Sequence, residues 1–174
     1  EILKNEIASA ISDVLLHGKY INGPEVEELE KKLGDFSSVK NVITCASGTD
    51  ALLLPLMAWG GGKGDAVFVP SFTFVATAEV VALLNATPVF VDVEEDTFNI
   101  NPQSLYEAIE FAKVKGLVPK VIIPVDLFGQ PACYDEINSL AKDNSIYVLA
   151  DAAQSFGASY RDKKVGSLTL VTST

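Results

Sequence analysis

Short apolar runs rich in β-branched residues alternate along this chain with segments of helical periodicity, and no repeat or low-complexity tract interrupts them. Strands are expected near residues 41–44, 66–69, 88–92, 120–124, 146–150 and 167–172, and helices near residues 5–16, 25–35, 50–60, 75–84, 102–113 and 134–142. This order predicts an α/β fold with a mostly parallel sheet and helical crossovers. Because ligands of such sheets bind beyond the carboxyl ends of the strands, polar residues at those ends are the functional candidates.

A carboxylate and an amide, Asp151 and Gln154, directly follow the apolar run at 146–150. An aspartate in this place can form a charge-assisted hydrogen bond to a protonated ring nitrogen, which a pyridine cofactor needs in order to act as an electron sink. The alternative is that Asp151 only caps the turn that follows the strand.

A second candidate is the turn Ser47-Gly48-Thr49, which lies between an expected strand and the helix expected at 50–60. Gly48 would let the backbone approach a ligand closely, and Ser47 and Thr49 offer hydroxyl groups. The free N–H groups at the start of a helix favour a phosphate. The alternative is an ordinary N-cap, in which the Ser47 side chain bonds the first turn.

Two aromatic residues, Phe72 and Phe74, follow the strand expected at 66–69. An aromatic face can stack on a flat heteroaromatic ligand, which contributes about 0.5–1.5 kcal/mol beyond the burial of area. We expect Phe72 to lie in the hydrophobic core, and Phe74 is the stacking candidate.

Composition excludes several classes of function. A chain of 174 residues can bury a sizeable core, and a net charge of −10 argues against nucleic acid or an anionic membrane as a partner. The two cysteines are far apart and the chain has a single histidine, so no metal site is expected. No apolar stretch approaches the ~20 residues of a membrane span, and no basic-then-apolar leader opens the chain, so a cytoplasmic location is expected.

Five segments in order resemble the DegT/DnrJ/StrS family of sugar aminotransferases, which have fold type I and use pyridoxal 5'-phosphate (PLP). They are residues 17–26, 47–52, 70–78, 124–130 and 151–157. The string from Asp151 to Tyr160 is most similar to the members that act on UDP-linked 3-keto N-acetyl hexuronic acids.

The resemblance implies a role for each candidate residue. Gly48 and Thr49 match residues that contact the PLP phosphate, and Phe74 matches a ring that stacks on the pyridine. Asp151 matches the catalytic aspartate that pairs with the ring nitrogen, and Gln154 matches a residue near the phenolic oxygen. The family often has histidine where this chain has Asp126, and the consequence of that difference is open at the level of sequence.

The same resemblance implies transfer of an amino group from glutamate to a nucleotide-linked keto sugar, in surface-polysaccharide or antibiotic sugar synthesis. It also implies a large PLP-binding domain with helices on both faces of its sheet, from residue 25 to residue 174, after an N-terminal segment of residues 1–24. A homodimer is expected, with residues 20–24, 47–49 and 74 near the subunit boundary.

In the family, a serine that completes the phosphate site and, five residues later, the Schiff-base lysine follow the position of Thr174. The lysines of this chain lie outside that motif: residues 4, 19, 31, 32, 40, 63, 113, 115, 120, 142, 163 and 164. We therefore expect this chain to be an incomplete large domain, without the C-terminal small domain and inactive by itself.

Three other readings stay open. A Rossmann or flavodoxin-like binding domain is also α/β, although no G-x-G-x-x-G motif follows the first expected strand. A PLP-dependent sugar dehydratase of the same family would have histidine in place of the Schiff-base lysine. A non-catalytic α/β fragment that binds PLP, or binds nothing, is the third possibility.

Overall fold

The protein, described here by a computed structural model that covers residues 2–174, consists of two compact units that divide between Thr44 and Cys45. The N-terminal unit contains helices α1 (Lys4–His17) and α2 (Pro24–Ser37). Proline at the first position of α2 has the backbone angle that a helix start requires. Gly23 precedes it because a β-carbon there would overlap the carbonyl oxygen of Lys19.

The single histidine of the chain links the two helices of this unit. The Nε2 atom of His17 lies 2.9 Å from Oε1 of Glu25, and its Nδ1 atom accepts a hydrogen bond of 3.0 Å from the backbone N–H of Lys19. The two bonds fix the loop that joins α1 to α2.

The prediction of a strand at residues 41–44 is wrong. Within the described residues this segment has no strand neighbour, and the backbone N–H of Thr44 donates to Oε1 of Glu30 at 2.8 Å instead of to a strand carbonyl. The side chain of Ile43 is 83% exposed, although it has high β propensity. A strand requires a partner, and propensity alone does not supply one.

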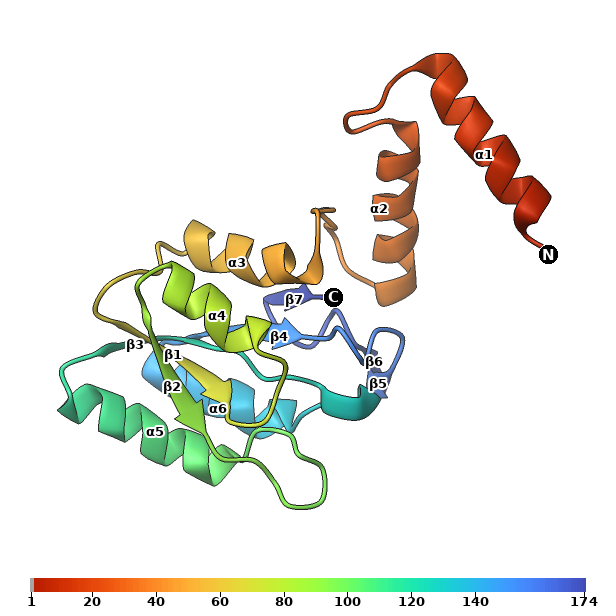
Figure 1. The fold of residues 1–174 in the computed structure, drawn as a ribbon. Helices are drawn as coiled ribbons and strands as arrows, with labels where there is room; N and C mark the ends of the chain where they lie inside the picture. The colour runs from red at the N-terminus through yellow and green to blue at the C-terminus, as the bar shows by residue number, and fades with distance from the viewer. Residues whose placement is uncertain (1) are drawn as a thin grey trace. The chain divides into compact units, whose positions relative to one another are not determined.

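The C-terminal unit is built on a parallel sheet with the strand order β2-β1-β3-β4-β7 (Figure 1). Its strands are β1 (Asp65–Pro70), β2 (Thr87–Val91), β3 (Val118–Ile122), β4 (Tyr147–Asp151) and β7 (Val171–Ser173). A small antiparallel hairpin of β5 (Ser159–Tyr160) and β6 (Lys163–Lys164) lies outside this sheet. The expected mostly parallel sheet is confirmed, although its last strand begins four residues later than predicted.

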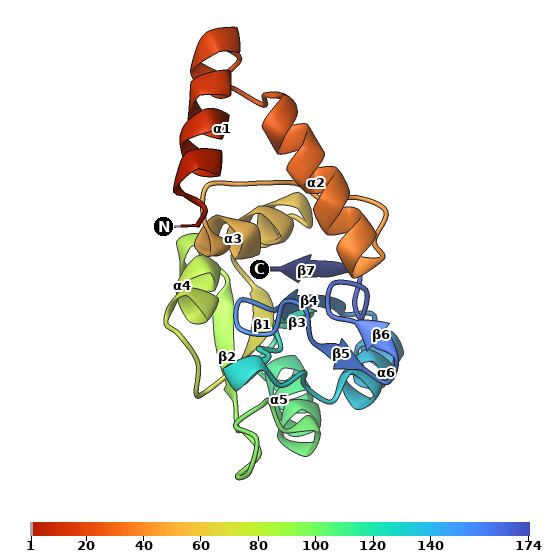
Figure 2. The same cartoon turned by 90° about the vertical axis from the view of Figure 1, so that its right-hand side faces the viewer.

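Helices cover both faces of the sheet, as Figures 1 and 2 show. One face packs against α3 (Gly48–Ala58) and α4 (Ala76–Leu83), and the other against α5 (Pro102–Val114) and α6 (Tyr134–Asn144). Alternate residues of β1 point to opposite faces, since Val67 lies in the core under α3 and α4 whereas Phe68 lies in the core over α5 and α6. The helices expected in this unit are therefore confirmed.

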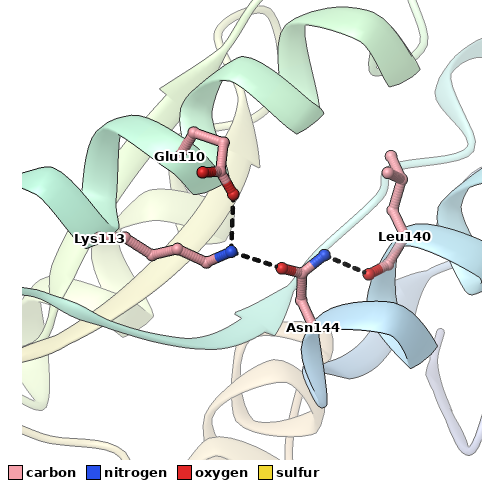
Figure 3. A network of polar contacts seen from close by, with 4 residues as sticks. All are labelled: Glu110, Lys113, Leu140 and Asn144. Atoms are coloured by element: carbon pink, nitrogen blue, oxygen red, sulfur yellow. Dashed lines mark hydrogen bonds and ion pairs between the residues drawn. The ribbon is translucent and has the colours of Figure 1, made fainter.

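A polar network on the surface joins α5 to α6 (Figure 3). Nζ of Lys113 donates to Oε1 of Glu110 at 2.6 Å and to Oδ1 of Asn144 at 2.7 Å, and the Asn144 amide donates to the carbonyl of Leu140 at 2.9 Å. Because Lys113 and Glu110 are exposed, their ion pair contributes little energy compared with the core beneath it.

Candidate functional site

Asp151 is the last residue of β4, and its side chain is only 7% exposed. Oδ2 accepts a hydrogen bond from Oγ1 of Thr77 and Oδ1 accepts one from the backbone N–H of Ala153, and both bonds measure 3.3 Å. No lysine, arginine or histidine in the described part of the chain forms an ion pair with this carboxylate. A buried charge held by two long hydrogen bonds lacks a strong partner, which is the property expected of a group that binds a cationic N–H.

Burial raises the pKa of the Asp151 carboxyl above its usual range, against the two hydrogen bonds, and the charge of Asp126 adds to the rise. A positively charged N–H placed beside the carboxylate would lower that pKa again. The electrostatics of the site therefore favour a ligand that carries a positive charge at this point.

The turn Ser47-Gly48-Thr49 starts α3, which packs over β4 and β7 (Figure 1). Ser47 is the N-cap of this helix, and its Oγ accepts a hydrogen bond of 3.1 Å from the N–H of Asp50. The capping role considered for Ser47 is thus confirmed. The N–H groups of Gly48 and Thr49 belong to the first helical turn, where no intrahelical partner exists. A β-carbon at Gly48 would meet nothing within 4 Å, so this backbone can be approached from outside.

The two phenylalanines after β1 are both exposed, Phe72 by 51% and Phe74 by 71%. The expectation that Phe72 lies in the core is wrong. Its ring packs on Phe98 at a centroid distance of 5.4 Å, and Phe98 in turn meets Phe128 edge-on at 6.0 Å. Phe98 and Phe128 both have left-handed backbones, with φ of 60° and 56°, which carry their rings to this edge. No ring in the described part of the chain stacks on Phe74, so its face is available.

Gln154 is held by the loop that follows β3. Its Oε1 accepts a hydrogen bond of 2.7 Å from the backbone N–H of Phe128, which leaves the amide NH₂ as a donor. Gly129 lies so close that a β-carbon there would be 3.2 Å from the carbonyl oxygen of Gln154. The segment 124–130 therefore supports the candidate site, a role that its sequence does not indicate.

Sequence reasoning also missed Thr77, which is fully buried in the first turn of α4. Its hydroxyl bonds both Asp151 and, at 3.2 Å, Oγ1 of Thr73. Thr73 precedes the helix, so its spacing from Thr77 gave no sequence signal for this contact.

Among residues 2–174, no three histidine, cysteine, aspartate or glutamate side chains gather where they could hold a metal ion. Over the same residues, no helix is both long enough and apolar enough to span a bilayer.

At its carboxyl edge the parallel sheet presents a carboxylate with few hydrogen bonds and the free N–H groups of a helix start. These two features suit a ligand with a cationic ring N–H and a phosphate, which are the two polar ends of a pyridoxal cofactor. The C-terminal unit is therefore a cofactor-binding α/β domain. The chain belongs to the DegT/DnrJ/EryC1/StrS aminotransferase family, whose sequence model matches residues 1–174. This family is PLP-dependent, and solved structures similar to this chain include PLP and pyridoxamine phosphate (PMP) forms.

Individual relatives agree with this assignment. A UDP-2-acetamido-2-deoxy-3-oxo-D-glucuronate aminotransferase from Pseudomonas aeruginosa is 51% identical over 172 residues, which are 99% of this chain and 46% of that protein. The crystal structure of a DegT DnrJ EryC1 StrS aminotransferase from Brucella abortus matches 94% of this chain and 44% of its own, with a TM-score of 0.92 and 53% identity. NtdA from Bacillus subtilis with bound cofactor PMP matches 97% of this chain and 36% of its own, with a TM-score of 0.86 and 32% identity. This chain spans less than half the length of these relatives.

Proposed function

We propose that this chain is the N-terminal, cofactor-binding part of a PLP-dependent aminotransferase that moves an amino group from glutamate to a nucleotide-linked keto sugar. The observation that carries the proposal is the carboxylate of Asp151, which is buried at the end of β4 and, among the described residues, accepts two hydrogen bonds of 3.3 Å and forms no ion pair. The named activity of the P. aeruginosa relative supports a UDP-linked 3-keto hexuronic acid as the sugar.

Each candidate residue has a distinct task in this proposal. Asp151 holds a proton on the ring nitrogen, the N–H groups of Gly48 and Thr49 bind the phosphate, and Phe74 covers one face of the ring. Gln154, fixed by the N–H of Phe128, directs its NH₂ group at the phenolic oxygen. When bound, PLP supplies the electron sink for amino transfer. The Schiff-base lysine is contributed from beyond Thr174, in the full-length enzyme.

The first prediction tests this function directly. Full-length enzyme loaded with PLP and given glutamate is expected to release 2-oxoglutarate in an amount equal to the enzyme sites, with a change in the visible absorption of the bound cofactor. Addition of a UDP-linked 3-keto hexuronic acid should then yield an amino sugar, detected by mass spectrometry.

Three results would contradict the proposal in different ways. A product that has lost water would identify a dehydratase. Formation of no keto acid from glutamate or from any other amino donor would exclude an aminotransferase. PLP binding without either reaction would indicate a non-catalytic domain.

We further propose a cytoplasmic enzyme of polysaccharide synthesis that works as a homodimer, with residues 20–24, 47–49 and 74 near the subunit boundary. Tyr20 and Ile21 support this arrangement, because they are 65% and 90% exposed on a loop that ends in a rigid Gly-Pro turn. Exposed apolar side chains on a constrained loop are typical of a surface that packs on a partner.

The second prediction concerns this boundary. Ile21→Asp is expected to weaken dimerisation of the full-length enzyme by about tenfold or more, because it places a charge in a packed apolar contact. Sedimentation equilibrium measures the dimer dissociation constant. Val114→Asp is a matched control, since Val114 is 85% exposed at the end of α5, outside the proposed boundary. Equal dissociation constants for Ile21→Asp and the wild type would remove this loop from the interface.

A further inference from the structure

Asp126 lies in the segment that follows β3, and its side chain is fully buried. The backbone joins it directly to the candidate site, because the N–H of Asp126 donates to the carbonyl of Asp151 at 3.0 Å and the N–H of Asp151 donates to the carbonyl of Pro124 at 2.9 Å. Asp126 and Asp151 therefore lie on two neighbouring backbone segments that are paired by hydrogen bonds at the carboxyl end of the sheet.

Three donors converge on the Asp126 carboxylate. Oδ1 accepts hydrogen bonds from the backbone N–H of Ala132 at 2.9 Å and from the hydroxyl of Tyr134 at 2.7 Å, and Oδ2 accepts one from the hydroxyl of Ser155 at 2.7 Å. Tyr134 and Ser155 are themselves only 1% and 2% exposed. In the described part of the chain no basic side chain pairs with Asp126.

Burial raises the pKa of the Asp126 carboxyl above its ordinary value and outweighs the hydrogen bonds from Ala132, Ser155 and Tyr134, which act in the opposite direction. Burial also raises the pKa of the Tyr134 hydroxyl, with a further contribution from Asp126, so this group stays protonated and remains a donor.

Two of the hydrogen bonds near Asp126 join the loop after β3 to the loop after β4. Ser155 follows Gln154 in the loop after β4, and Phe128, whose N–H binds Gln154, lies two residues after Asp126. The loops after β3 and β4 are thus joined at two points, one at Gln154 and one at Ser155. The Asp126 carboxyl at this junction orders the loop that carries Asp151 and Gln154.

We propose that Asp126 is a positioning residue for the reaction, which fixes the loop of Asp151 and Gln154 through Ser155 and so keeps Asp151 in place beside a bound ring nitrogen. This inference rests on the proposed function. Asparagine would fill the same volume but presents an NH₂ group on one side, so it cannot accept from both Tyr134 and Ser155, and the loss of an acceptor is what distinguishes this role from simple packing.

The test uses the full-length enzyme loaded with nitrogen-15-labelled PLP, whose ring-nitrogen resonance reports protonation. Asp126→Asn is expected to move this resonance towards that of neutral pyridine and to lower turnover about tenfold, since a displaced loop no longer holds Asp151 against the ring nitrogen. Tyr134→Phe is the matched control, because it removes the hydrogen bond to Oδ1 but keeps the one from Ser155 to Oδ2, and it should leave the resonance close to that of the wild type.

A resonance unchanged in Asp126→Asn, with the cofactor bound, would overturn the inference. If Asp126→Asn does not fold, Ser155→Ala replaces it, because it removes the hydroxyl that links the loop to Asp126, and the same shift is expected. The resonance requires only bound cofactor, so it tests Asp126 even if the wild-type enzyme fails to release 2-oxoglutarate. That failure would count against the proposed function and not against the role of Asp126.

Discussion

Replacing Asp151 with asparagine in the full-length enzyme is expected to lower turnover by at least about a hundredfold, because a neutral amide does not keep a ring nitrogen protonated. Cofactor affinity should fall much less, since the N–H groups at the start of α3 still bind the phosphate. Single-turnover release of 2-oxoglutarate measures the first quantity, and titration with PLP measures the second.

Asp143→Asn provides the control for this substitution, because Asp143 is exposed on α6. It should behave as the wild type in both measurements. A single-turnover rate for Asp151→Asn within a few-fold of the wild type would show that Asp151 is not the group that binds the ring nitrogen.

The same substitution is expected to stabilise the cofactor-free protein by about 1–3 kcal/mol, because it removes a buried carboxylate that lacks a strong partner. The amide retains an oxygen that accepts from the N–H of Ala153, and its NH₂ can donate to the hydroxyl of Thr77. Urea denaturation of the cofactor-free proteins, with Asp143→Asn as the control, measures the free energy of unfolding.

The gain in the free energy of unfolding of Asp151→Asn should also depend on pH. Burial raises the pKa of Asp151 from its ordinary value of 3.8, so above that pH the native state keeps a proton that the unfolded chain has released. The stability of the cofactor-free wild type therefore falls as pH rises through the interval between the two pKa values, and the fall is complete above the native one. Asp126 contributes in the same direction, so Asp151→Asn should reduce this slope without removing it. Lower stability of Asp151→Asn at neutral pH would mean that the native carboxylate is well compensated.

The sequence predicted the sheet well where burial and β propensity agree. The run before Asp151 is apolar and β-rich, and Val148, Leu149 and Ala150 are indeed buried in β4. The segment 41–44 has similar propensity, yet it forms no strand, because pairing depends on a neighbour that a local pattern cannot specify.

The candidate site was predicted less completely, for two physical reasons. Its supports come from residues far apart in the chain, such as Thr77, which lies 74 positions from Asp151. The exposed rings depend on left-handed backbones at Phe98 and Phe128, a conformation that phenylalanine seldom adopts. Residue type could therefore nominate Asp151, but it could not indicate how Asp151 is held.

The order of the sheet has a consequence for how the protein is made on the ribosome. β1 and β2 are neighbours, and β3, β4 and β7 follow on the other side of β1, one after another in the order in which they are synthesised. Each new strand meets a neighbour that is already present, so the sheet can grow behind the exit tunnel without waiting for later sequence. Thr77, whose hydroxyl bonds Asp151, is synthesised before β4, so a partner for the carboxylate is already present when β4 joins the sheet.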